Sequence, residues 1–170
     1  MNVELLNGTS KLEIFLSVFY KLLWRLMPSV LQVTHTISMG NFVITFRPFI
    51  LSDQHITDPS FEKDVRAHFQ PKTNQTVIDV GAHIRLYTLI ACRMVGPNGK
   101  VFSIEPDKSN LKVLRKNVAI NKFKNAVVLP IAPSCTNGEE KIYAGIMPTG
   151  SSFYPTLSRA RYTTYTLSES

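Results

Sequence analysis

The chain has 170 residues, of which 44% are hydrophobic and 18% are charged. This length and composition suit one globular unit with a hydrophobic core, and they exclude a chain that is disordered over most of its length. The formal net charge of +7 is compatible with nucleic acid, anionic membrane or a phosphorylated substrate as partners, but it carries no information about the fold.

Residues 10–27 form the first periodic segment. Its apolar side chains recur at the spacing of one helical face, and they are Leu12, Phe15, Leu16, Phe19, Leu22, Leu23 and Leu26. Lys21 and Arg25 lie on the other side, and these charges together with a length of about 16 residues argue against a membrane span. The helix either packs on its own domain, which we favour, or lies in a membrane surface with Trp24 at the interface. Peripheral membrane contact through residues 10–27 therefore stays open.

A β-hairpin and a short helix are predicted next. Residues 30–37 and 42–46 are β-rich and flank a turn at Gly40. Asp58 or Ser60 is expected to cap a short helix that runs to the region of residue 68. With the first helix, these elements make up a predicted N-terminal extension.

From residue 71 onward the sequence alternates between strands and helices. The predicted strands are residues 76–80, 101–104 and 126–131, and the predicted helices are residues 86–95 and 107–121. This alternation is typical of an α/β fold in which right-handed helical crossovers join parallel strands. We therefore assign residues 1–70 to the N-terminal extension and residues 71–170 to an α/β domain.

The alternation lapses after Ile131. A turn is predicted at Asn137-Gly138, followed by short strands within residues 141–144, 152–154 and 162–167. No fourth strand–helix unit follows these strands in the sequence.

The residues from Val77 to Thr88 read Val-Ile-Asp-Val-Gly-Ala-His-Ile-Arg-Leu-Tyr-Thr. A buried strand ends near Gly81, and a glycine at such a strand–helix junction lets the backbone approach a ligand closely. The helix that follows offers free N–H groups to a carboxylate or phosphate. Glu105, which lies 24 positions after Gly81, ends the next strand, where a carboxylate can accept hydrogen bonds from both hydroxyls of a ribose. The two junctions together predict a site for a nucleoside cofactor.

The order of these residues narrows the class of cofactor. A dinucleotide site requires G-x-G-x-x-G directly after the strand, and only Gly81 is present here. An acidic residue, one intervening residue and glycine, as in Asp79-Val-Gly81, is the order seen in class I methyltransferases. The segment closely resembles the opening motif of the FkbM family of methyltransferases, which usually reads Asp-x-Gly-Ala-Asn-x-Gly-x-Tyr/Phe-Thr/Ser. The resemblance covers approximately residues 77–145, and it continues through Val101 to Pro106, Asn117, Asn121 and the turn from Ala132 to Gly138.

The resemblance implies a partial Rossmann-like class I methyltransferase fold that binds S-adenosyl-L-methionine. It also implies methyl transfer to oxygen, with a hydroxyl of a sugar or another small molecule as the acceptor. Carried over by position, Asp79, Gly81 and Ala82 line the methionine part of the cofactor and Glu105 holds the ribose. His83 lies in the same loop, where a role in positioning the backbone is favoured over that of a general base. The simpler alternatives are that Asp79 caps a turn and that Glu105 belongs to the cap of the next helix. The sequence does not identify a catalytic base.

Two residues of the motif depart from the family pattern. His83 stands where the family usually has Asn, and Arg85 stands where it has Gly. The last glycine of such loops permits close packing of helix on strand, and the charge of an arginine can repel the sulfonium of the cofactor. The opposite possibility is that Arg85 pairs with the carboxylate of the cofactor. We favour weakened or absent binding.

The chain ends at Ser170, near the point where the resembled family continues into a strand with the sequence Lys-Ile-Asp-x-Glu-Gly. We therefore expect a truncated domain, with the edge of residues 77–80 unpaired, and a gene fragment or degraded copy is one hypothesis. A noncatalytic binding or assembly module is the alternative function. A nucleic-acid partner is disfavoured, because the basic residues at 108–124 mostly decorate one amphipathic helix and its end.

The two cysteines, Cys92 and Cys135, are far apart and match neither a disulfide framework nor a metal site. Cys92 falls in an apolar helical segment and is expected to be a buried thiol. Because the first residues do not resemble a signal peptide, we expect a reducing, cytoplasmic environment.

Overall fold

The computed structural model of the chain describes residues 34–48, 50–58, 60–134, 138–144, 151–152 and 161–169, together with Leu12, Phe15, Leu16, Phe19 and Leu23. Cys135, residues 30–33 of the predicted hairpin and most of residues 10–27 lie outside the described residues.

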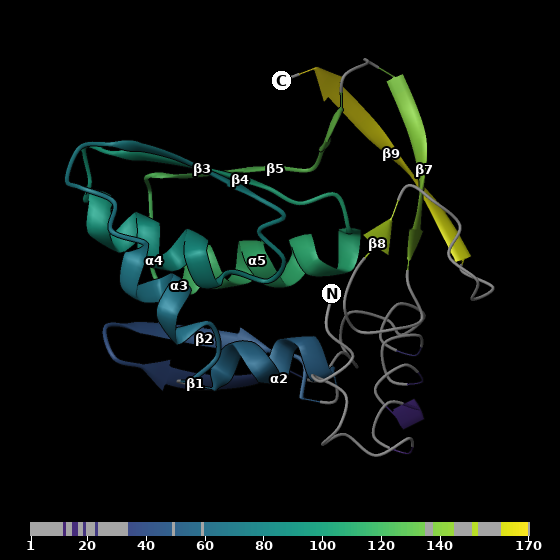
Figure 1. Cartoon of the computed structure of the whole chain (residues 1–170), viewed down its shortest axis with the longest axis horizontal. Helices are drawn as coiled ribbons and strands as arrows, with labels where there is room; N and C mark the ends of the chain where they lie inside the picture. Colours follow the sequence, from purple (N-terminus) through teal and green to yellow (C-terminus); the bar gives the residue numbers. More distant parts are fainter. Residues whose placement is uncertain are drawn as a thin grey trace.

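A parallel three-stranded sheet forms the centre of the fold. Its strands are β3 (Thr76–Val80), β4 (Lys100–Ile104) and β5 (Ala126–Leu129), in the spatial order β3-β4-β5. The crossovers are α4 (Leu86–Val95) and α5 (Lys108–Ile120), and both helices lie on the same face of the sheet (Figure 1). The strand–helix alternation predicted from the sequence is confirmed, and the fold is α/β and Rossmann-like.

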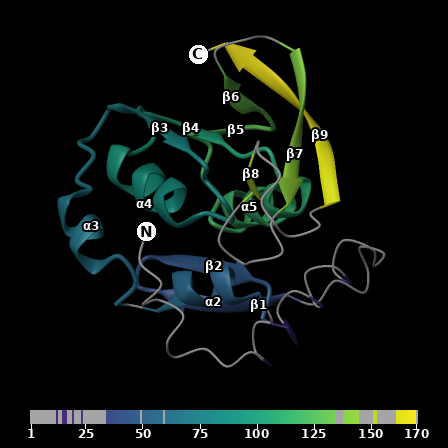
Figure 2. The same cartoon turned by 45° about the vertical axis from the view of Figure 1, so that its right-hand side comes forward.

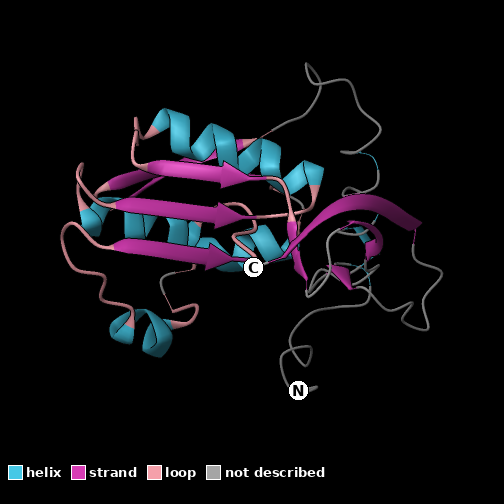
Figure 3. Cartoon of the chain, turned by 90° about the horizontal axis from the view of Figure 1, so that it is seen from above, coloured by secondary structure: helices cyan, strands magenta, loops and turns pink. Residues whose placement is uncertain are grey.

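The two faces of this sheet have different surroundings. Because side chains alternate along a strand, Val101 and Ser103 point toward the helices and are fully buried, whereas Ile78 and Val80 on the opposite face are 64% and 62% exposed. The strand register continues this opposite face across the sheet in two apolar rows, which are Ile78, Phe102 and Val127, and Val80, Ile104 and Leu129. Figure 3 shows this face, with the three strands in front. The sheet therefore packs a core on one side and presents apolar side chains on the other.

The core lies between the sheet and the helices. One cluster joins Val95 and Cys92 of α4 to Val101 of β4, and a second joins Ile84 and Leu86 to the helices around them. Cys92 is buried as predicted, and burial raises the pKa of its thiol to about 12. It is therefore an unreactive thiol that fills space in the core.

An antiparallel hairpin of β1 (His35–Met39) and β2 (Phe42–Phe46) packs on the side of α5 away from the sheet (Figures 1 and 2). The connecting turn uses Gly40, whose φ is +57°. The hairpin was predicted, although within the described residues its first strand begins at His35 and runs to Met39, two residues beyond the predicted end.

Two asparagine side chains of α5 take the place of a neighbouring strand for β2. The amide of Asn117 accepts from the Thr45 N–H at 2.6 Å and donates to the Thr45 carbonyl at 2.8 Å. The amide of Asn121 makes the same pair of bonds to the backbone of Val43, at 2.7 and 2.6 Å. The hairpin is therefore bonded to the helix at alternate residues of β2.

Helices α2 (Leu51–Thr57) and α3 (Lys63–His68) connect the hairpin to the central sheet. Helix α2 was not predicted, because it is short and has no side-chain N-cap. The predicted capping of α3 by Asp58 or Ser60 is wrong. Asp58 instead accepts hydrogen bonds from the N–H and hydroxyl of Ser60 at 2.8 Å each, which closes a local turn, and α3 begins only after Glu62.

A second sheet follows the central one. It contains β6 (Ala132–Ser134), β7 (Gly138–Ala144), β8 (Ser151–Ser152) and β9 (Arg161–Glu169), in the spatial order β6-β9-β7-β8. Strand β9 runs parallel to β6 and antiparallel to β7. The sequence predicted the presence of short strands here but not their assembly into one sheet.

Five residues of the first periodic segment are described, and all five are helical: Leu12, Phe15, Leu16, Phe19 and Leu23. Their side chains are 38–64% exposed, and the rings of Phe15 and Phe19 stack at 6.2 Å. This differs from the favoured packing of the segment on its own domain. None of the helices in the described part of the chain has the length and apolar content to cross a bilayer.

Candidate functional site

The loop between β3 and α4, residues 81–85, holds three of the predicted site residues. Gly81 has a φ of +78°, which glycine adopts readily, and a Cβ at this position would meet no atom within 4 Å. The N–H groups of Gly81 and Ala82 both donate to the carbonyl of Ile104, at 2.9 and 3.0 Å. The loop is thereby tied to the end of β4, and the glycine leaves open space beside its backbone.

The two residues that depart from the family pattern both have positive φ angles. The φ of His83 is 53° and that of Arg85 is 152°. Asn and Gly, the residues that the family usually has at these positions, adopt such angles more easily than most residues do. A non-glycine residue in such a backbone conformation costs about 1–3 kcal/mol, so Arg85 is a strained position of this loop.

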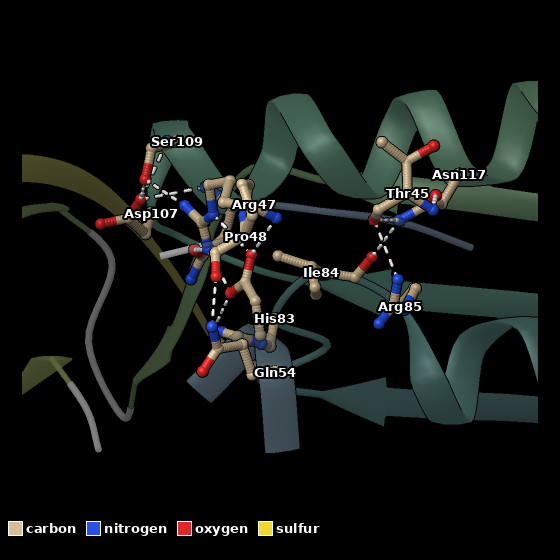
Figure 4. Close-up of polar contacts among 12 residues, drawn as sticks. Thr45, Arg47, Pro48, Gln54, His83, Ile84, Arg85, Asp107, Ser109 and Asn117 are labelled. Atoms are coloured by element: carbon tan, nitrogen blue, oxygen red, sulfur yellow. Dashed lines mark hydrogen bonds and ion pairs between the residues drawn. The ribbon is translucent and has the colours of Figure 1, made fainter. Parts of the chain in front are cut away.

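The side chain of Arg85 is fully buried and lies against the hairpin (Figure 4). Its Nη1 donates to the Thr45 carbonyl at 2.9 Å, whereas Nε and Nη2 have no hydrogen-bond partner. Burial lowers the pKa of this guanidinium to about 9, an effect that Arg47 reinforces and Asp53 opposes. Arg85 is thus a poorly compensated buried cation between the loop and β2.

Asp79 is held by the first turn of α4. Its Oδ2 accepts from the Thr88 hydroxyl at 2.6 Å, and the Thr88 oxygen lies 2.9 Å from the hydroxyl of Ser103. Since the single Thr88 proton points to Asp79, Ser103 donates to Thr88. Burial raises the pKa of Asp79, although the hydrogen bonds from Thr88 lower it. In this arrangement the carboxylate anchors the start of the helix.

Glu105 lies at the end of β4 and is 5% exposed. Its Oε2 accepts from the His83 N–H at 2.8 Å. Its Oε1 accepts from the Asp107 N–H at 2.8 Å and from Nδ2 of Asn110 at 3.3 Å. Burial raises the pKa of this carboxyl, and the same hydrogen bonds lower it. The carboxylate therefore joins the 81–85 loop to the start of α5.

Asp107 is the N-cap of α5. Its Oδ1 accepts from the N–H groups of Ser109 at 2.8 Å and Asn110 at 3.1 Å. It also accepts from the Ser109 hydroxyl at 2.6 Å. This is the strongest type of N-cap, and it fixes the direction in which the helix leaves Glu105.

Three polar residues beside the site were missed by sequence reasoning: Arg47, Asp53 and Asn110. Arg47 and Asp53 are fully buried, with Nε–Oδ2 2.7 Å apart, and Arg47 Nη2 donates to Oδ1 of Asn110 at 2.8 Å. The only signal was two opposite charges within the apolar stretch around Ile44, Ile50 and Ile56, a pattern that favours a buried ion pair. No pattern in the sequence around these residues indicates that they lie close to Glu105.

The structure brings the predicted site residues to one edge of the sheet, where β3 and β4 end. Gly81, Ala82 and His83 all hydrogen-bond to Ile104 or Glu105. Asp79 lies in β3, two residues before Gly81, and its carboxylate accepts a hydrogen bond from Thr88 of α4. Two strand ends, an open glycine and a helix N-terminus are the arrangement that α/β sheets use to bind ligands.

No family model and no curated protein sequence matches the chain. Several solved structures are similar to it. An S-adenosylmethionine-dependent methyltransferase from Aquifex aeolicus is 30% identical over 46% of this chain and 40% of its own, with a TM-score of 0.37. M. jannaschii TYW2 in complex with AdoMet is 20% identical over 58% and 43%, with a TM-score of 0.46. An O-methyltransferase from Thermotoga maritima is 14% identical over 59% and 55%, with a TM-score of 0.39. The chain thus spans about 40–55% of the length of these structures.

Proposed function

We propose that this chain carries the cofactor-binding part of an S-adenosyl-L-methionine-dependent methyltransferase. The observation that supports this most is the pairing of Gly81 with Glu105 at the ends of two neighbouring parallel strands. The glycine has open space beside it, and the carboxylate is bonded to the same loop through the His83 N–H.

The residues present fit such a cofactor. A carboxylate has about four acceptor positions, and Oε2 of Glu105 has the His83 N–H as its hydrogen-bond donor, so that this oxygen can still accept from a ribose hydroxyl. Gly81, Ala82 and Asp79 would lie along the methionine part. The bound cofactor would supply the methyl group, and the protein would contribute by holding cofactor and acceptor in register.

The FkbM family, and a hydroxyl of a sugar or a similar small molecule as the acceptor, are the finer parts of the proposal. They rest on the motif from Val77 to Thr88 and on the positions of Asn117 and Asn121.

A matched pair of glycine variants tests the proposal. Gly81 and Gly40 both have positive φ, and in both cases a Cβ would meet no atom within 4 Å. Alanine therefore strains the backbone at both positions without a steric clash, but only position 81 faces the proposed cofactor. The side chain of Arg85 lies against β2, and S-adenosylhomocysteine has no sulfonium charge, so we no longer expect Arg85 to prevent binding. We expect the unaltered chain to bind S-adenosylhomocysteine in isothermal titration, Gly81→Ala to weaken binding about tenfold or more, and Gly40→Ala to leave it unchanged. Equal weakening in both variants would contradict the proposed site.

A noncatalytic binding module is the second candidate, and the exposed apolar face at Ile78 and Val80 favours it. Contiguous exposed apolar surface of this kind is typical of interaction sites. If the unaltered chain is folded by circular dichroism and gives no heat with S-adenosylmethionine or S-adenosylhomocysteine, this second function is the better account.

A further inference from the structure

We propose that Arg47 and Asp53, which belong to the N-terminal extension, are positioning residues for Glu105. This proposal rests on the proposed function, in which Glu105 holds the ribose of the cofactor. It makes Arg47 and Asp53 a part of the cofactor site rather than a separate attachment to it.

The first step is the fixed orientation of Asn110. Its Oδ1 accepts from Arg47 Nη2 at 2.8 Å, and its Nδ2 donates to Glu105 Oε1 at 3.3 Å. A guanidinium has only donors, so the oxygen of the amide must face Arg47. The amide nitrogen then faces Glu105, and the arginine sets the direction of the hydrogen bond that the carboxylate receives.

The second step is the fixed position of Arg47. Its Nε and Nη2 donate to the two oxygens of Asp53 at 2.7 and 2.8 Å, a bidentate pair. The Arg47 N–H also donates to Asp53 at 3.0 Å, and Nη1 donates to the Ser109 hydroxyl at 3.0 Å. With both charges fully buried, the guanidinium has one available geometry.

The third step closes a ring. His83 Nε2 lies 3.7 Å from Oδ1 of Asp53, and the His83 N–H donates to Glu105. The five residues of this ring, here called the polar ring, are Arg47, Asp53, His83, Glu105 and Asn110; His83 contributes both its backbone N–H and its side chain. Figure 4 labels Arg47 and His83 of the polar ring, together with the nearby residues Asp107 and Ser109. The ring links α2, the 81–85 loop and the start of α5, so a change at Arg47 is transmitted to the carboxylate without touching a ligand.

The expected effect is on ribose recognition specifically. The probes are S-adenosylhomocysteine and its 2′,3′-dideoxy analogue. The dissociation constant of the analogue divided by that of S-adenosylhomocysteine measures how much the ribose hydroxyls contribute to binding. Asn110→Ala removes the link between Arg47 and Glu105 without burying an unpaired charge, and we expect it to lower this ratio about tenfold. Arg47→Lys retains the charge but not the planar arrangement of donors, and we expect it to lower the ratio as well. If Asn110→Ala does not fold, Arg47→Lys provides the test.

The matched control is Asn121→Ala. It breaks two hydrogen bonds between α5 and the hairpin, and Asn110→Ala likewise breaks two, to Arg47 and Glu105. Asn121, however, lies at the other end of the helix. We expect it to lower thermal stability and keep the ratio. If Asn110→Ala and Arg47→Lys bind with the ratio of the unaltered chain, the positioning role is overturned while the proposed function stands. If the unaltered chain binds neither probe, the proposed function fails and this proposal fails with it.

Discussion

The two strand–helix junctions of the candidate site differ in how well their polar groups are satisfied. At the β4–α5 junction, Glu105 and Asp107 together accept six hydrogen bonds, and Asp107 caps the helix. At the β3–α4 junction, the helix has no side-chain N-cap at Arg85, and that residue combines a φ of 152° with two unpartnered buried nitrogens. The β4–α5 junction is therefore well ordered by its hydrogen bonds, and the strain is concentrated at the β3–α4 junction.

Removal of the buried charge at position 85 is expected to have the largest effect. Arg85→Met keeps most of the side-chain volume and eliminates the unpartnered nitrogens. The Thr45 carbonyl still accepts from Asn117, so no acceptor is orphaned. We expect the free energy of unfolding to rise by about 2–3 kcal/mol, measured by urea denaturation. Lower stability in Arg85→Met would mean that the guanidinium is compensated in solution, and the contrast between the junctions would be lost.

The backbone strain at the same position can be isolated by comparing Arg85→Gly with Arg85→Ala. Both variants remove the guanidinium and leave a similar void, so their difference reports mainly on the φ of 152°. We expect Arg85→Gly to be more stable than Arg85→Ala by about 1–2 kcal/mol. The control is the same pair at Arg93, an exposed position in α4, where alanine should be the more stable residue.

The opposite junction should respond in the opposite sense. Asp107→Ala removes the acceptor for the N–H groups of Ser109 and Asn110, and we expect a loss of about 1 kcal/mol, within a range of about 0.5–2. Asp107→Asn retains a good N-cap and is expected to lose only a few tenths of a kcal/mol. Equal losses in both variants would indicate that the charge, and not the cap, is what matters.

The smallest expected effect is a pH dependence from Asp79. Burial raises its pKa in the folded chain, so between the ordinary carboxyl pKa of about 4 and this raised value the folded chain holds more protons than the unfolded one. Stability therefore falls as the pH rises through that window. Asp79→Asn should flatten this part of the profile, as measured by urea denaturation from pH 4 to 7.5. An unchanged slope would show that Asp79 ionises normally.

The sequence predicted the elements that depend on local pattern. Strand β3 and helix α4 have the predicted bounds, because an apolar run followed by glycine and an apolar helix leaves few alternatives. Gly81 and Glu105 were predicted to lie near each other, since parallel strands end at one edge of a sheet, and the His83–Glu105 bond agrees with that expectation.

The remaining features depend on contacts between distant residues. The bond between Arg47 and Asn110 spans 63 positions, and no spacing rule relates such residues. The inward direction of the Arg85 side chain was equally inaccessible, because it depends on the hairpin lying beneath the loop. Helix α2 could not be predicted from the sequence, because it has no side-chain N-cap and is only seven residues long.

The asparagine bonds between α5 and β2 also set an order of events during synthesis. The N–H of Thr45 finds its partner 72 positions later in the chain, and that of Val43 finds its partner 78 positions later. At ~5–20 residues per second, the ribosome needs about 4–16 s to make the intervening chain. During that interval neither N–H has the asparagine side chain that bonds it in the final fold. The hairpin is made early, yet it acquires its lasting partners only when α5 has emerged.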